Sequence, residues 1–161
     1  PILQDHSVDL IVAAQAAHWF DLPRFYDEVR RVAAPNAVLA LITYRPTQIV
    51  DPVANAVLQD FYTRTVSPYW PADRHHVETG YQSLDFPFPE EPGPDMKIEV
   101  QWDLEQVVGY AGTWSAVKEY RHRCGEDPLP ILRRGLTSVW GAPDDKKTTF
   151  WPLSYRITRL P

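Results

Sequence analysis

The first 45 residues alternate between apolar runs and an amphipathic segment, a pattern that few folds accommodate. Residues 8–14 (VDLIVAA) and 37–44 (AVLALITY) are almost wholly apolar. Runs of this kind are typical of parallel strands that are buried on both faces. Between them, apolar residues recur with helical spacing from Leu22 to Ala33, directly after the capping residue Asp21. The pattern predicts a βαβ unit with parallel strands and a right-handed crossover.

The rest of the chain is broken into shorter elements, in keeping with 16 prolines among 161 residues. The patterns predict a helix over 52–66, a Pro- and aromatic-rich loop over 67–95 with a short helix at 72–79, a strand over 98–103, helices over 104–111, 114–123 and 129–140, and a last strand over 153–160. We expect one domain, with the βαβ unit at 1–45, the helix and loop at 46–96, and the last two strands with their intervening helices at 97–161.

Composition excludes several classes of protein. The net charge is −5, and acidic and basic residues are interleaved, which argues against a nucleic-acid surface or an anionic-membrane patch. No apolar run is long enough to span a membrane. The single cysteine, Cys124, excludes an internal disulfide and a Cys-based zinc site, and it indicates a reducing cytoplasm. His75 and His76 lack a third ligand at metal-binding spacing, so no metal is expected.

Polar and aromatic residues follow both strands of the predicted βαβ unit. Gln15, His18 and Trp19 come directly after the first strand, and Tyr44 ends the second. In open α/β sheets, ligands bind beyond the carboxyl ends of the strands, so these residues are candidates for a binding site. The alternative is structural: Gln15 and His18 satisfy loop backbone, Trp19 packs under the helix, and Tyr44 is an exposed strand end.

A second group of candidates is aromatic and follows the βαβ unit. Together these residues could roof an apolar substrate, whereas each alone also suits a hydrophobic core. The five residues are Tyr69, Trp70, Tyr110, Trp114 and Trp140. No G-x-S-x-G, G-x-G-x-x-G or G-x-x-x-x-G-K motif is present, which disfavours an α/β-hydrolase, a dinucleotide site and a triphosphate site.

The segment 5–21, DHSVDLIVAAQAAHWFD, resembles the type 11 methyltransferase family and is most similar to its trans-aconitate methyltransferase-like branch. In that family the fourth strand leads into A-Q-A-x-H-W-F-D, and a helix then leads to R-V-L-K-P-G-G. The corresponding residues here are Ala14–Asp21 and the segment RVAAPNA at 31–37. A looser similarity extends through Thr113-Trp114-Ser115 and Trp151-Pro152-Leu153.

The resemblance implies an α/β fold, namely the C-terminal part of a Rossmann-like class I methyltransferase sheet. Strands four and five of that sheet would be 8–14 and 37–44, and strands six and seven would be 98–103 and 153–159. The implied strand order is 4-5-7-6, with the last strand antiparallel. The helices between the last two strands would form a cap over the substrate.

The resemblance also implies methyl transfer from S-adenosyl-L-methionine to a small-molecule acceptor, with a carboxylate suggested by the branch. The methionine end of the cofactor would lie against Ala14, Gln15 and Ala16, with His18 and Trp19 near the methyl donor. His18 would be a base or would donate a hydrogen bond to a carboxylate. The implied substrate-binding residues are Tyr44, Trp70, Tyr110, Trp114 and Trp140.

The 161 residues of the chain lack several cofactor-binding features of the family pattern. The family's glycine-rich loop and two acidic cofactor-binding residues precede its fourth strand, so they belong upstream of Pro1. We therefore expect this chain alone to bind the cofactor weakly or not at all. We also expect the exposed edge of the first strand to self-associate or to pair with an N-terminal half. Asn36, in place of a family glycine, can adopt the left-handed conformation.

Two alternatives to the enzyme remain at this stage. One is a truncated, non-catalytic relative that acts as a binding or scaffolding domain. The other is an unrelated α/β enzyme such as a reductase, which the absence of a glycine motif disfavours.

Overall fold

The computed structural model describes residues 2–161, which form two compact units. The first unit comprises the residues up to Pro46, together with Asp73–Lys97 and Pro152–Pro161. The second unit comprises Thr47–Ala72 and Ile98–Trp151. Each unit thus combines segments that are far apart in the sequence.

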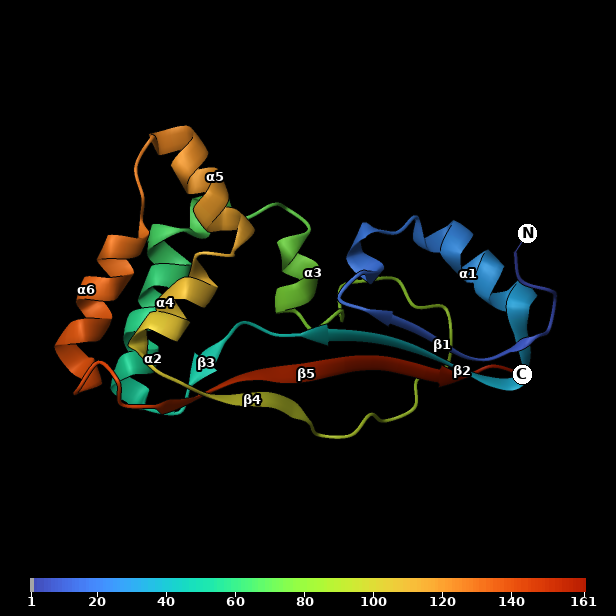
Figure 1. Ribbon diagram of the computed structural model, residues 1–161. Helices are drawn as coiled ribbons and strands as arrows, with labels where there is room; N and C mark the ends of the chain where they lie inside the picture. The colour runs from blue at the N-terminus through green and yellow to red at the C-terminus, as the bar shows by residue number, and fades with distance from the viewer. Residues whose placement is uncertain (1) are drawn as a thin grey trace. The chain divides into compact units, whose positions relative to one another are not determined.

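The first unit contains the predicted βαβ arrangement (Figure 1). Strand β1 (Val8–Ala14) is followed by helix α1 (Leu22–Val32) and strand β2 (Ala33–Tyr44). β1 and β2 are parallel, and the register is regular from Leu10↔Val38 to Ala14↔Ile42. Strand β5 (Lys147–Arg159) pairs antiparallel with β2, from Val38↔Arg159 to Tyr44↔Leu153. The expected parallel pair beside an antiparallel last strand is therefore confirmed.

Strand β2 begins earlier than the sequence predicts. It starts at Ala33 rather than Ala37, and it includes Pro35. Asn36 has a φ of 65°, so the left-handed conformation expected at this position is confirmed. The parallel register shifts between Val8 and Leu10, where the irregular start of β2 meets β1.

Helix α1 forms because its ends and its faces are well defined. The Asp21 side chain accepts a hydrogen bond from the Arg24 N–H at 3.3 Å, which caps the first turn. Tyr26, Val29 and Val32 recur at three-residue spacing and are buried. Tyr26 and Val29 belong to a core that α1 forms with the odd-numbered face of the sheet, notably Leu39 and Leu41 of β2 and Ala13 of β1.

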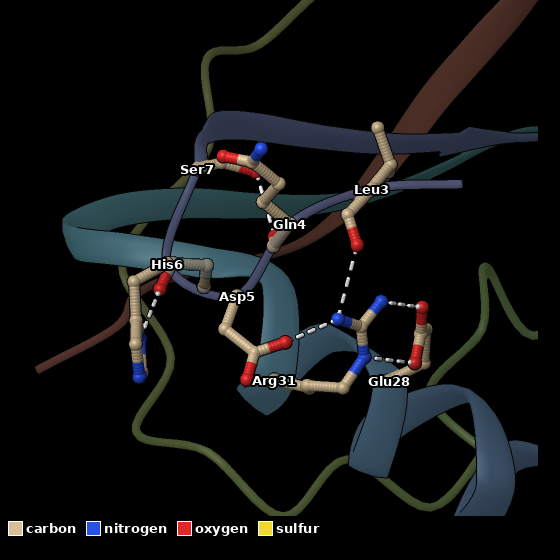
Figure 2. A network of polar contacts seen from close by, with 8 residues as sticks. Leu3, Gln4, Asp5, His6, Ser7, Glu28 and Arg31 are labelled. Atoms are coloured by element: carbon tan, nitrogen blue, oxygen red, sulfur yellow. Dashed lines mark hydrogen bonds and ion pairs between the residues drawn. The ribbon is translucent and has the colours of Figure 1, made fainter. Parts of the chain in front are cut away.

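Arg31, in the last turn of α1, holds the N-terminal segment in place (Figure 2). Its guanidinium donates to the Glu28 carboxylate at 2.8 and 2.6 Å and to the Leu3 carbonyl at 3.1 Å, and it forms an ion pair with Asp5. His6 Nδ1 lies 3.1 Å from the Ala33 carbonyl oxygen. The chain before β1 is thus attached to the end of α1 and the start of β2.

The prediction that β1 is buried on both faces is wrong for this chain. Leu10 and Val12 are 59 % and 49 % exposed, whereas Ala13 on the opposite face is buried. Successive side chains of a strand point to opposite faces. One face of β1 therefore packs against the core, and Leu10 and Val12 on the other face remain about half exposed within residues 2–161.

The second unit is largely helical. It contains α2 (Pro52–Asp60), a π-turn over Phe61–Thr65, a 3₁₀ turn over Ser67–Tyr69, α4 (Leu104–Ala111), α5 (Ser115–Cys124) and α6 (Leu129–Trp140). These helices match the predicted ones, and the predicted 52–66 helix changes to π geometry in its last turns. Asp51 and Asp103 cap α2 and α4 with their side chains. No helix of the described part of the chain is long and apolar enough to cross a membrane.

Two further strands pair with β5. Strand β4 (Lys97–Trp102) pairs with it, which confirms the predicted pairing of the last two strands. Strand β3 (Gln48–Ile49) pairs antiparallel with β5 through Gln48↔Phe150 and was not predicted, because two residues are too short to show a periodicity. β5 itself begins at Lys147 rather than Leu153.

Candidate functional site

The carboxyl ends of β1 and β2 bring polar side chains together in the first unit. Gln15 follows β1 directly and has a φ of 54°, a left-handed conformation that turns the chain away from the sheet. Its N–H still donates to the Ile42 carbonyl at 2.7 Å, and its side-chain Oε1 accepts from the Thr43 hydroxyl at 2.6 Å and the Tyr44 N–H at 3.2 Å. Gln15 therefore joins the ends of the two strands through its backbone and its side chain.

The following 3₁₀ turn, Ala17–Trp19, places His18 at the same end of the sheet. His18 Nδ1 lies 2.8 Å from the Tyr81 hydroxyl oxygen, and its ring packs 4.8 Å from the Trp19 ring. Burial lowers the pKa of His18, and the nearby Asp73 carboxylate partly opposes this effect. Neutral imidazole is therefore favoured at pH 7.

Tyr81 reaches His18 from the turn that follows helix α3 (Arg74–Glu78), more than sixty residues further along the chain. Gly80 and Tyr81 have φ values of 63° and 66°, so two successive left-handed residues end the helix. A Cβ at Gly80 would lie 2.6 Å from Ser154 Oγ of β5, and therefore only glycine allows this approach. Tyr81 is fully buried.

The Tyr81 hydroxyl is held in its neutral form. Burial raises the pKa of Tyr81, and this outweighs hydrogen bonds with Thr43 and with the backbone N–H groups of His18 and Ala17, which lower it. The sequence prediction missed Tyr81. The available signal, a glycine ending a short predicted helix, does not indicate where the next side chain points.

An ion pair with a buried guanidinium fixes the Tyr81 backbone to β5. Arg156 is 7 % exposed, and its guanidinium donates to both Glu90 carboxylate oxygens at 2.7 and 2.6 Å. The same guanidinium donates to the carbonyls of Tyr81 at 2.9 Å and Leu84 at 3.1 Å. Sequence analysis also missed this pair, because its members lie 66 residues apart.

The residues expected to contact the cofactor lie on an open part of this site. Ala14 is exposed and Ala16 half-buried, so the backbone between them is approachable. Trp19 is 64 % exposed and presents an aromatic face that could attract a cationic sulfonium. None of the seven glycines lies between residues 14 and 19. These residues are accessible, they include no glycine, and their contact with the methionine end of S-adenosyl-L-methionine stays a prediction.

The candidate substrate residues are divided between the units. Tyr44 belongs to the first unit, whereas the other four lie together in the aromatic core of the second. The Tyr110 hydroxyl accepts from Trp151 Nε1 at 2.9 Å, and Trp140 is 2 % exposed and donates to the Asp145 carbonyl at 2.8 Å. Trp114 and Trp140 are buried and are therefore core residues. Substrate binding stays a prediction for all four residues, namely Trp70, Tyr110, Trp114 and Trp140.

The described residues contain no cluster of three or more His, Cys, Asp or Glu side chains that could hold a metal ion. His76 Nδ1 lies 2.8 Å from the Ser83 hydroxyl, which gives that ring a local structural contact. Cys124 is exposed and lies 3.0 Å from the Tyr69 hydroxyl.

Comparisons with known proteins agree with this arrangement. Residues 1–41, which contain β1 and α1, match the family described as Methyltransferase domain. A Dictyostelium discoideum protein that is provisionally named a methyltransferase is 28 % identical over 144 residues. A solved structure from Anaeromyxobacter dehalogenans, provisionally assigned as a type II methyltransferase, is 46 % identical, with a TM-score of 0.91 over 98 % of this chain.

These similarities support a class I S-adenosylmethionine-dependent methyltransferase. It covers 55 % of the length of the Dictyostelium relative and 66 % of the Anaeromyxobacter chain. The trans-aconitate methyltransferase-like branch stays a prediction.

Proposed function

We propose that this chain supplies the methyl-acceptor side of an active site that methylates a small molecule. The observation that carries the proposal is the polar cluster of Gln15, His18 and Tyr81 at the carboxyl ends of β1 and β2. The matched family segment ends beside this cluster, and ligands of open α/β sheets bind beyond this edge. A carboxylate is the proposed acceptor, since the half-buried imidazole of His18 suits a compact anionic group.

S-adenosyl-L-methionine, when bound, supplies a methyl group that its sulfonium has already activated. The protein then contributes mainly alignment of the acceptor with that methyl group. Gln15 is well suited to this task, because both strand ends hold its side chain. Trp19 would lie against the positive charge, and His18 would take a proton from the acceptor or donate a hydrogen bond to it.

Calorimetric titration with S-adenosylhomocysteine tests the proposal. We expect residues 1–161 to bind it weakly or not at all, and a chain extended upstream to include a glycine-rich loop to bind one equivalent. In the extended chain, Trp19→Ala should weaken binding, whereas the control Val50→Ala, which alters a similarly exposed side chain of the second unit, should not. Tight binding by residues 1–161 alone would disprove the division of the cofactor site. Failure of the extended chain to bind would favour a non-catalytic binding or scaffolding role.

A further inference from the structure

The contact between Tyr81 and His18 has a direction that the chemistry of the two groups determines. A phenol O–H is a stronger donor than a neutral imidazole N–H, and an imidazole nitrogen is a stronger acceptor than a phenol oxygen. At 2.8 Å, one proton lies between Tyr81 Oη and His18 Nδ1. The more favourable placement of that proton is on Tyr81, with Nδ1 accepting.

The neighbours of the two groups support the same direction. Gln15 Oε1 accepts a hydrogen bond from the Tyr44 N–H, which identifies this atom as the amide oxygen. The Thr43 hydroxyl therefore donates its own proton to Gln15 Oε1. Thr43 can therefore compete for the phenol proton only as a hydroxyl acceptor, which is weaker than imidazole.

The Tyr81 side chain is also held more firmly than a surface hydroxyl. It is fully buried, its backbone is turned by Gly80, and its carbonyl accepts from the buried Arg156. A hydroxyl on such a support fixes both the position and the tautomer of the ring that it contacts.

We infer that Tyr81 is a positioning residue that holds His18 as the Nε2–H tautomer, so that His18 donates a hydrogen bond to the acceptor rather than removing its proton. This inference rests on the proposed function where it concerns the acceptor, and it deepens that function. An imidazole whose Nε2 carries hydrogen suits an acceptor atom that is already deprotonated at neutral pH, such as a carboxylate oxygen. It does not suit an alcohol, which must lose a proton during the reaction.

The tautomer can be measured directly in residues 1–161 without cofactor. Long-range ¹H–¹⁵N correlation spectra of the histidine-labelled chain distinguish protonated from unprotonated ring nitrogens. The His18 signals are assigned by their loss in His18→Gln. We expect Nε2 to be protonated and Nδ1 unprotonated at pH 7. A protonated Nδ1 in the wild-type chain would overturn the inference. This test does not depend on whether any variant folds.

Two variants separate positioning from general stability. Tyr81→Phe should abolish the single tautomer and give His18 a population with hydrogen on Nδ1. Tyr26→Phe is the matched control, because Tyr26 is another buried tyrosine of the same core and its hydroxyl donates to the Asp85 carbonyl at 2.7 Å. It should leave the His18 signals unchanged. An unchanged tautomer in folded Tyr81→Phe would also overturn the inference. Because these spectra need no cofactor, a failure of S-adenosylhomocysteine binding disproves the proposed function separately.

Discussion

Arg156 shows how a single charged residue can organise the segment that leads to the site. Its guanidinium is buried and donates to two backbone carbonyls as well as to Glu90. A buried guanidinium is tolerated only when its donors and its charge are satisfied. Glu90 supplies the opposite charge, so the segment from Tyr81 to Glu90 depends on this pair.

Glu90→Gln should destabilise the first unit by about 1–2 kcal/mol, because it removes the carboxylate but keeps the side-chain size. Removing one partner of a fully buried ion pair costs roughly 3–5 kcal/mol of stability. The expected loss is smaller here, because the Glu90 side chain is 42 % exposed. The measurement is the urea midpoint. Glu91→Gln is the control: Glu91 lies 3.7 Å from Arg159, both side chains are about half exposed, and the change should stay within about 0.5 kcal/mol. Equal effects of the two variants would contradict this account.

At the scale of elements, two helices of the second unit contain glycines with opposite roles. Gly109 lies inside α4, where it lowers helix stability, and a Cβ there would meet no atom within 4 Å. Gly125 ends α5 in a left-handed conformation with a φ of 70°. It is also open to solvent, so only the backbone conformation distinguishes the two positions.

Alanine at these positions should therefore change stability in opposite directions. Gly109→Ala should stabilise the second unit by about 0.5–1 kcal/mol, because alanine has the higher helix propensity. Gly125→Ala should destabilise it by about 1 kcal/mol, because a Cβ disfavours the left-handed conformation. Urea unfolding followed by far-UV circular dichroism measures both. Stabilisation by Gly125→Ala would show that this residue does not hold α5 in a left-handed cap.

At the scale of the whole molecule, β1 combines an unpaired edge with an uncovered apolar face. β1 is at the end of the strand order within residues 2–161, and Leu10 and Val12 are exposed beside that edge. Exposed edges with apolar side chains pair readily with other strands. We propose that this edge binds a second copy of the chain or an N-terminal half supplied to it.

Size-exclusion chromatography with light scattering should therefore show concentration-dependent self-association of residues 1–161. Val12→Lys should shift the chain toward monomer, because a lysine on an edge strand opposes pairing. Val50→Lys is the matched control, since Val50 is 58 % exposed and lies outside the β1 face. A wild-type chain that remains monomeric at all concentrations would disprove the binding of a second copy at this edge.

Helices and strands that are specified by nearby residues were predictable from the sequence. The parallel pair β1 and β2, helix α1 and the three helices from Leu104 to Trp140 follow from apolar periodicity and capping residues, which depend on neighbours within a few positions. The position of Gln15 and His18 directly after the first strand placed them at the carboxyl edge of the sheet. Family resemblance added the antiparallel last strand.

Other features were decided only by tertiary structure, because they depend on residues far apart in the chain. An apolar strand such as β1 appears identical in sequence whether both of its faces are covered or only one, and the exposure of Leu10 depends on what packs over it. The approach of Tyr81 to His18 depends on the left-handed turn at Gly80, the close packing of Gly80 against Ser154 and the hydrogen bond from Arg156 to the Tyr81 carbonyl. The sequence by itself thus determined most of the helices and strands and the resemblance to methyltransferases, whereas long-range packing decided which side chains face one another in the site.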